Sequence, residues 1–85
     1  MAYLLRFERR ALEDTAKLNP DIAARLIDKL EWFASRNNPL EFAIRLQDSE
    51  IGDYRFRIGD YRVIFDVVKQ IIIIRRIGHR RSIYL

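Results

Sequence analysis

The sequence contains no cysteine and a single histidine, His79, among its 85 residues. The absence of cysteine excludes disulfide bonds, thiolate metal sites and a cysteine nucleophile, and it fits a reducing compartment. One histidine provides no His-rich metal motif, and the three glycines form no Gly-rich phosphate loop. No Ser-His-Asp arrangement is evident. The chemistry open to this chain is therefore narrow, and we predict neither a metal ion nor a cofactor.

Long apolar segments are also missing. The isoleucine run from Ile71 to Ile74 has only four residues, far fewer than the roughly 20 that a membrane helix requires. The N-terminal segment MAYLLRFERR lacks the basic start, long apolar middle and small-residue cleavage site of a signal peptide. We therefore expect a soluble cytoplasmic protein that does not associate with a membrane. The length predicts a single domain over residues 1–85.

Acidic residues become scarce in the second part of the chain. Residues 1–50 contain eight Lys or Arg and nine Asp or Glu, whereas residues 51–85 contain eight against three, so the net charge of +4 arises from the C-terminal part. Thirteen of the sixteen basic residues are arginine, whose planar guanidinium can bind a phosphate through two parallel hydrogen bonds. This asymmetry favours a polyanionic partner, most simply a nucleic acid.

Most of the strand signal lies between residues 54 and 84. Gly59 and Asp60 separate two alternating segments and fit a type II′ hairpin turn, which takes glycine at its first central position. This turn places Arg57 opposite Arg62 and sorts the side chains onto two faces. The predicted core face consists of Tyr54, Phe56, Ile58, Tyr61, Val63, Phe65 and Val67.

The other face, which we call the arginine face, collects Arg55, Arg57 and Arg62. Like charges directly across a ladder repel each other, so we interpret this face as a binding site for an anion. The alternative is a solvated face on which the arginine stems cover Ile64 and Ile73.

A second two-residue turn at Lys69 and Gln70 would extend the arginine face. It would pair Arg75 opposite Ile64, and His79 and Arg81 would point the same way if strand geometry persisted past Ile77.

The first half of the chain predicts one strand followed by two helices. Alternation predicts a strand over residues 2–7, and the spacing of apolar residues predicts a helix over residues 9–18. Asn19, Pro20 and Asp21 then provide an N-cap, a proline at the first helical position and an acidic first turn, which predict a second helix ending near Arg36.

We therefore expect an α+β fold in which a two-helix antiparallel hairpin packs on one face of a small antiparallel sheet of about four to five strands. Residues 43–47 would form a short strand, and the loop after it would border the arginine face. Ile71, Ile73 and Ile77 would lie on the arginine face, covered either by the chain's own tail or by a docked segment of a partner.

The run YRFRIGDYRVIF, followed by an apolar strand and then IGHRRSIY, resembles the RelE/ParE superfamily of bacterial and archaeal toxins, most closely its RelE branch of mRNA interferases. The resemblance spans the whole chain in length, element order and termini. It implies a RelE-like toxin domain that cleaves mRNA in the ribosomal decoding site and has a RelB-like antitoxin as its partner.

The resemblance also suggests roles for individual residues. Arg55 and Arg57 stand where the prototype RelE has two lysines, and Arg62 stands at the arginine of the family's GYR motif. Arg80 matches the arginine near the C-terminus, and Tyr84 resembles the terminal tyrosine implicated in general base work or base stacking.

The predicted site combines this resemblance with the two-face argument. The expected catalytic residues are Arg57, Arg62, His79, Arg80 and Tyr84, and the expected RNA-binding residues are Arg55, Arg75 and Arg81.

Cleavage of RNA needs no metal when the RNA supplies its own nucleophile. A 2′-hydroxyl in line with the neighbouring phosphate can displace the 5′-oxygen and leave a 2′,3′-cyclic phosphate, while guanidinium groups stabilise the charge on the phosphorane oxygens. Arginine cannot give up its proton near neutral pH, so the proton would be moved by His79 or Tyr84. The alternative function is that of a ParE-like DNA gyrase inhibitor without nuclease activity.

Overall fold

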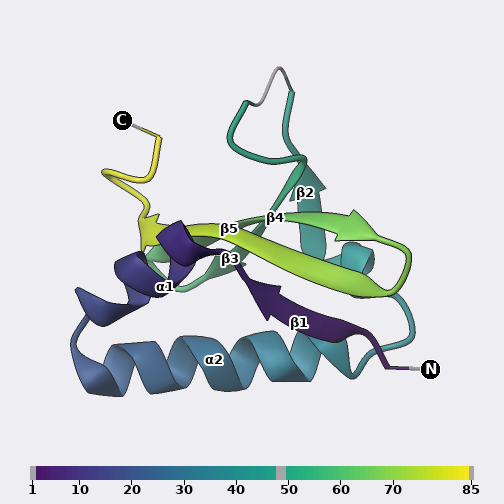
Figure 1. Cartoon of the computed structure of the whole chain (residues 1–85), viewed down its shortest axis with the longest axis horizontal. Helices are drawn as coiled ribbons and strands as arrows, with labels where there is room; N and C mark the ends of the chain where they lie inside the picture. The colour runs from purple at the N-terminus through teal and green to yellow at the C-terminus, as the bar shows by residue number, and fades with distance from the viewer. Residues whose placement is uncertain (1, 48–49, 85) are drawn as a thin grey trace.

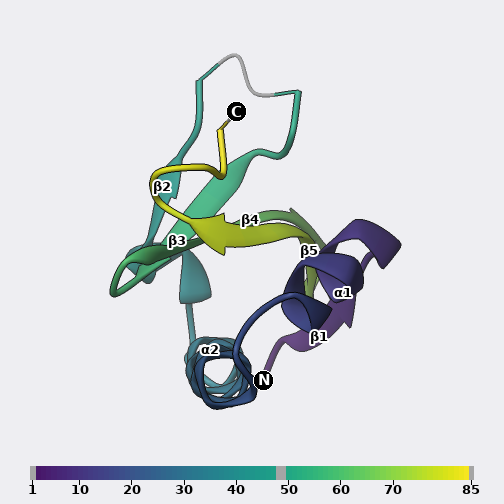
Figure 2. The same cartoon turned by 90° about the vertical axis from the view of Figure 1, so that its left-hand side faces the viewer.

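A five-stranded sheet with one helix-covered face organises the chain (Figure 1). The computed structural model describes residues 2–47 and 50–84. The strands lie in the order β1, β5, β4, β3, β2. The helix α2 runs along one face, whereas the C-terminal segment and the described parts of the β2–β3 connection lie on the opposite side of the sheet in both views (Figures 1 and 2). This arrangement confirms the predicted α+β class.

The elements follow the predicted order, with bounds that differ by a few residues. They are β1 (Leu4–Phe7), α1 (Arg9–Ala16), α2 (Pro20–Ala34), the short 3₁₀ helix η1 (Pro39–Phe42), β2 (Ala43–Arg45), β3 (Tyr54–Ile58), β4 (Tyr61–Val68) and β5 (Ile71–His79). None of the helices in the described part of the chain is long and apolar enough to cross a membrane.

The helix α2 begins where its capping residues predict. The Asn19 side chain accepts a hydrogen bond of 2.9 Å from the N–H of Asp21, and Pro20 occupies the first turn. The helix buries Leu26, Leu30, Phe33 and Ala34. These side chains belong to the main core, in which the rings of Phe33, Phe56 and Phe65 stack with centroid distances of 4.2 and 4.1 Å.

The β3–β4 hairpin has the predicted register. Ile58 pairs with Tyr61, Arg57 with Arg62 and Phe56 with Val63. Gly59 adopts a φ of +58°, a backbone conformation that glycine adopts without steric cost. The seven residues of the predicted core face are all fully or partly buried in the main core. The first turn therefore separates an apolar face from a charged face, as the alternation requires.

The register between β4 and β5 is only partly as predicted. Lys69 and Gln70 do form a two-residue turn, and Val68 pairs with Ile71. A β-bulge between Ile64 and Phe65 then shifts the pairing, so that Ile64 faces Arg76 and not Arg75. The prediction that Arg75 pairs opposite Ile64 is therefore wrong, because one extra residue in β5 reverses the alternation beyond it.

The bulge also corrects two predictions farther along β5. Ile77 pairs with Val63 and is buried in the main core, and it does not lie on the arginine face. His79 pairs with Tyr61, and the two rings meet edge to face at 5.5 Å. The His79 side chain thus lies on the core face of the sheet, opposite to the prediction.

The edge strand β1 departs from the predicted antiparallel arrangement. It pairs in parallel with β5, with Leu4 opposite Ile71 and Phe7 opposite Ile74, whereas the other pairs are antiparallel. Tight hairpins force neighbouring strands to run in opposite directions. No hairpin connects β1 to β5, because the helices and the other strands lie between them in the chain.

A second apolar contact region lies on the arginine face, outside the main core. Ile64 is fully buried there, and a Cβ placed on Gly52 would lie 2.5 Å from its Cγ2 atom. The N–H of Asp53 donates to Asp66 Oδ1 at 2.8 Å, which holds this part of the β2–β3 connection against β4. The connection therefore borders the arginine face, as predicted, and covers part of its apolar surface.

The helix α1 is joined to β5 through Asp14. The Asp14 carboxylate accepts hydrogen bonds from Arg76 Nε at 2.8 Å and from the backbone N–H of Ile77 at 2.9 Å. Strand β1 has already ended at this level, since the last pair is Phe7 with Ile74. Asp14 therefore satisfies a backbone donor on the exposed edge of β5 that no strand reaches.

Asp14 should make the free energy of unfolding depend on pH in the acidic range. Burial opposes ionisation, but the hydrogen bonds from Arg76 and Ile77 outweigh it and lower the pKa of Asp14 below its ordinary value. This contribution to stability is present above the unfolded pKa of about 3.9 and is lost as pH falls through the folded value. Asp14→Asn should cost about 2 kcal/mol of unfolding free energy at pH 7 and should weaken the acid dependence in denaturant titrations.

The matched control is Glu13→Gln. Glu13 forms a surface ion pair with Arg9 at 3.5 Å, and such pairs contribute little. Equal losses of stability in the two variants would contradict the role assigned to Asp14.

Candidate functional site

Two neighbouring strands place three arginines on the arginine face. Arg55 and Arg57 come from β3, and Arg62 from β4 lies directly across from Arg57. Arg62 is only 8% exposed, and its Nη1 atom donates to the carbonyl oxygens of Gly59 and Tyr61 at 2.9 Å each. The backbone of the hairpin turn therefore holds one nitrogen of Arg62. Its other N–H groups have no hydrogen-bond acceptor among residues 2–47 and 50–84.

Arg62 lies at the electrostatic centre of this group. Burial is the largest cause that lowers the pKa of Arg62 from its ordinary value, followed by the charges of Arg57 and Arg55. Arg80 acts in the same direction, and Tyr84 acts in the opposite one. Arginine nevertheless stays protonated at neutral pH. The fold therefore gathers positive charge around Arg62, and a bound anion would relieve the repulsion.

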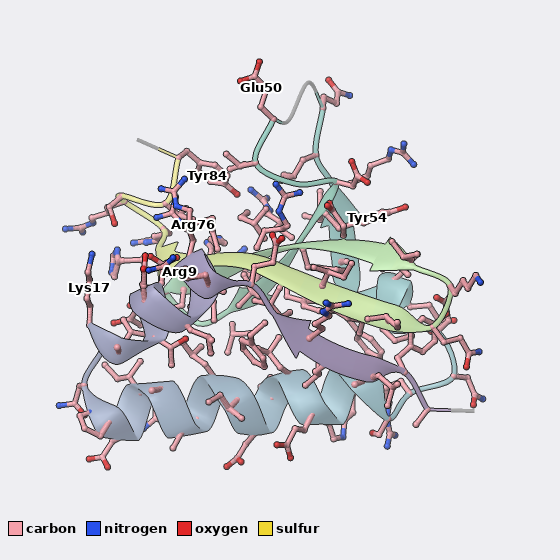
Figure 3. The ribbon with its side chains drawn as sticks, viewed as in Figure 1. Arg9, Lys17, Glu50, Tyr54, Arg76 and Tyr84 are labelled. Carbon is pink, nitrogen blue, oxygen red and sulfur yellow. The ribbon has the colours of Figure 1, made fainter. Side chains whose placement is uncertain are left out.

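The C-terminal segment brings Tyr84 to the same face. Figure 3 shows Tyr84 on the side of the sheet away from α2. Its hydroxyl oxygen accepts a hydrogen bond of 3.0 Å from Arg55 Nη1, and its side chain is half-exposed. The Nε atom of Arg55 is buried and has no partner among the described residues. Arg55 therefore connects Tyr84 to the arginines and retains a hydrogen-bond donor that the described residues leave unsatisfied.

Arg80 joins the group from the turn that follows β5. Its backbone N–H donates to the carbonyl oxygen of Asp60 at 2.7 Å. Its side chain is half-exposed and lies 3.7 Å from the Asp60 carboxylate. An ion pair of this length between exposed groups is weak, so Asp60 leaves the Arg80 guanidinium available to a stronger anion. We use "arginine cluster" for Arg55, Arg57, Arg62 and Arg80.

The structure places the other predicted site residues elsewhere. His79 lies on the core face, and its Nδ1 atom accepts a hydrogen bond from the N–H of Arg81 at 3.2 Å. Arg75 pairs with Asp66 at 2.6 Å and with Glu8, and the hydrogen bond that Arg75 donates to Asp66 is the largest cause that raises the pKa of Arg75. Arg81 lies exposed in the C-terminal turn. The roles predicted for these three residues stay predictions, but none of them joins the arginine cluster through a described contact.

The loop residue Glu50 lies apart from the arginine cluster. It borders a pocket of about 330 Å³ together with Glu8, Arg9 and Arg75, on the side of the sheet where α1 begins. Among residues 2–47 and 50–84, no group of three or more His, Cys, Asp or Glu side chains could hold a metal ion. The arginine cluster and Tyr84 are therefore the chemical groups that the described fold brings together.

Sequence reasoning missed the carboxylates that separate structural arginines from free ones. Asp66 and Glu8 pair with Arg75, and Asp14 pairs with Arg76. The ion pair between Asp66 and Arg75 could have been suspected from the sequence, because Asp66 lies two residues after Ile64 and therefore on the arginine face. Asp14 and Arg76 are 62 positions apart in the sequence, and no local sequence pattern predicts a contact over that separation.

The like-charge pair of Arg57 and Arg62 predicts two opposite responses in one variant. In low salt, Arg57→Gln should raise the unfolding free energy by about 0.2 to 1 kcal/mol, because it removes the repulsion across the ladder. The same variant should gain less stability from added inorganic phosphate than the wild type, because an anion binds the native cluster and stabilises it by mass action. Melting temperatures measured across a phosphate titration would test both responses.

The control for this experiment is Lys29→Gln, which removes an exposed charge from α2 on the helix-covered side of the sheet. An equal phosphate response in the wild type, Arg57→Gln and Lys29→Gln would argue against a cluster that binds anions.

Comparisons with known proteins show which family the chain belongs to. Residues 5–84 match the family model described as the ParE toxin of the type II toxin-antitoxin system parDE. No curated protein matches the chain significantly. Among solved structures, the toxin-antitoxin complex RelBE2 from Mycobacterium tuberculosis contains a chain that is 30% identical, with a TM-score of 0.78, over 94% of this chain and 100% of that one.

Two archaeal structures are also similar. A chain of the RelB-RelE antitoxin-toxin complex from Methanococcus jannaschii is 26% identical, with a TM-score of 0.70, over 93% of this chain and 94% of that one. A chain of the RelE-RelB complex from Pyrococcus horikoshii is 25% identical, with a TM-score of 0.72, over 96% and 99%. The protein therefore belongs to the ParE toxin family within the RelE/ParE superfamily, and it is a RelE-like toxin of a type II toxin-antitoxin system.

Proposed function

We propose that this toxin is a metal-independent endoribonuclease that cleaves mRNA and thereby inhibits translation. The observation that carries the proposal is the surroundings of Arg62, which is buried, held by two backbone carbonyls, directly opposite Arg57 and close enough to Arg55 and Arg80 for their charges to lower its pKa. Convergent guanidinium groups suit a phosphate whose negative charge increases in the transition state. A surface that acts by contact alone has no need to gather them against their own repulsion.

The reaction requires positioning and charge more than covalent help from the protein. The 2′-hydroxyl oxygen of the RNA attacks the adjacent phosphorus atom, the bond from phosphorus to the 5′-oxygen breaks, and the products are a 2′,3′-cyclic phosphate and a free 5′-hydroxyl. The nucleophile gives up a proton and the leaving oxygen takes one. In this mechanism Arg57, Arg62 and Arg80 stabilise the phosphorane oxygens. DNA lacks the 2′-hydroxyl and is not cleaved.

We assign proton transfer to Tyr84 in preference to His79. Tyr84 contacts Arg55 through its hydroxyl oxygen, and Arg55 belongs to the arginine cluster. His79 faces Tyr61 on the core face, and its Nδ1 atom is occupied by a backbone donor. A general base or acid must lie within hydrogen-bonding reach of the reacting oxygen, and Tyr84 is the residue that shares a face with the arginine cluster.

The proposed setting of the reaction rests on the resemblance to RelE-type toxins, which implies action on mRNA in the ribosomal decoding site. The three similar solved structures described above are toxin-antitoxin complexes. For this chain we propose the same substrate, translated mRNA on the ribosome in the cytoplasm, and a RelB-like antitoxin as its partner. Eight basic residues against three acidic ones in residues 51–85 favour an RNA-rich target.

The second candidate function is inhibition of DNA gyrase without nuclease activity. It is favoured by the family model that matches the chain, whose description names the ParE toxin. Mapping of mRNA 5′ ends after expression distinguishes the two functions. Cuts at defined codon positions would support the nuclease, whereas intact mRNA together with trapped DNA breaks would support the gyrase inhibitor and refute the nuclease.

Substitutions at two arginines should abolish most of the cleavage. Arg80→Ala should lower the cleavage rate about a hundredfold, the usual effect of removing one group that stabilises transition-state charge. Arg62→Lys, which keeps the positive charge but loses the planar fork, should also impair cleavage and leave the fold intact. Rates would be measured on ribosome-bound mRNA, with Lys29→Ala, a substitution of an exposed residue on α2, as the control. Full toxicity in a folded Arg62→Lys, Arg80→Ala double variant would refute the assignment.

The two candidates for proton transfer can be compared directly. Tyr84→Phe removes only the hydroxyl group and should lower the cleavage rate by roughly 10²-fold to 10⁴-fold, and it should flatten the pH profile of the reaction. His79→Gln should leave the pH profile unchanged. A larger loss in His79→Gln than in Tyr84→Phe would reverse the assignment.

A further inference from the structure

The C-terminal segment of residues 80–84 carries two groups of the site but belongs to no strand or helix. Its turn is closed locally, because the N–H groups of Ser82 and Ile83 both donate to the carbonyl oxygen of His79, at 2.9 and 3.0 Å. Local hydrogen bonds fix the shape of a turn but not its direction relative to the sheet. Other contacts must therefore determine where Arg80 and Tyr84 lie.

Ile83 is the buried residue of this segment. It is 5% exposed, whereas the next residue, Tyr84, is 49% exposed. Ile83 is not part of the main core around α2. Burial of a full isoleucine side chain is a substantial apolar contribution, and here it lies beside the arginine face.

The Ile83 side chain packs against Gly78 of β5. A Cβ placed on Gly78 would lie 2.9 Å from Ile83 Cδ1 and 3.5 Å from Ile83 Cβ. Gly78 does not have a positive φ, unlike Gly52 and Gly59. The backbone at Gly78 therefore does not require glycine, and the absent side chain leaves the space that Ile83 fills.

The position of Gly78 links this contact to the site. Gly78 pairs with Arg62 across the β4–β5 ladder, so Ile83 is seated beside the central arginine. On one side of Ile83 the segment is held by the hydrogen bond from the Arg80 N–H to Asp60 at 2.7 Å. On the other side, the next residue is Tyr84, whose hydroxyl accepts from Arg55 at 3.0 Å.

We infer that Ile83, seated on Gly78, is the positioning residue that holds Tyr84 and Arg80 over the arginine face. It touches neither the phosphate nor the reacting atoms and acts through the segment that it anchors. The consequence for cleavage rests on the proposed function, but the anchoring itself does not.

Amide hydrogen exchange tests the anchor without reference to activity. Ile83→Ala should speed exchange of the Arg80 and Ile83 N–H groups, because the segment loses its apolar seat, and should leave the β4 amides protected. Leu12→Ala, which truncates an exposed side chain on α1, is the control. Unchanged exchange of the Arg80 and Ile83 N–H groups in Ile83→Ala would overturn the inference.

Cleavage kinetics test the consequence for the site. Ile83→Ala should lower the rate at saturating RNA roughly 10-fold to 100-fold, since a displacement of about 1 Å in a catalytic group can have an effect of this size. The RNA concentration for half-maximal rate should change little, because the arginines of β3 and β4 stay in place. An effect on RNA affinity alone would contradict a positioning role.

A double-mutant cycle tests the contact between the two residues. Gly78→Ala introduces a methyl group 2.9 Å from Ile83 Cδ1 and should lower the cleavage rate. Ile83→Val lacks that Cδ1 atom and should make Gly78→Ala much less harmful. Effects that simply add would show that the residues do not act through their contact.

These outcomes separate the anchor from the proposed function. If Ile83→Ala releases the Arg80 amide while the wild type cleaves no RNA, the anchor stands and the nuclease proposal fails. If the wild type cleaves RNA while exchange and rate are both unchanged in Ile83→Ala, the nuclease stands and the anchor fails.

Discussion

Repulsion between Arg57 and Arg62 is the constraint around which the rest of the site is arranged. The β3–β4 register places the two residues directly opposite each other, and such a pair costs stability in the absence of an anion. The fold tolerates the repulsion because the backbone carbonyls of Gly59 and Tyr61 hold one end of Arg62. The hairpin turn thus provides both the register that creates the pair and the acceptors that keep Arg62 in place.

The repulsion is confined to the arginine cluster, because carboxylates pair with the arginines of β5. Arg75 is paired with Asp66 and Glu8, and Arg76 is paired with Asp14. These pairs neutralise the positive charge near α1. Near the β3–β4 turn, by contrast, neither Arg57 nor Arg62 has an ion-pair partner among the described residues. The net charge of the C-terminal part is therefore concentrated near the β3–β4 turn, where a polyanion gains most from binding.

The β-bulge in β5 determines how the C-terminal segment takes part. Without the extra residue, strict alternation would place Ile77 and His79 on the arginine face. With it, Ile77 fills the main core, His79 faces Tyr61, and Gly78 comes to lie opposite Arg62. The space above Gly78 is then open to Ile83, and the chain that follows reaches Arg55 through Tyr84. The bulge thus removes His79 of β5 from the arginine face and allows Tyr84 of the C-terminal segment to lie there.

The sequence by itself determined the features that depend on neighbouring residues. The turn at Gly59, the alternation of β3 and β4, the N-cap at Asn19 and the α+β order of elements all follow from short-range sterics and side-chain periodicity. Only the tertiary structure decided the bulge at Arg75, the parallel pairing of β1, the Asp14 contact with β5 and the seat of Ile83 on Gly78. These features depend on packing between segments that are distant in the chain or joined by irregular backbone. A periodic pattern carries no information about where its own period is interrupted.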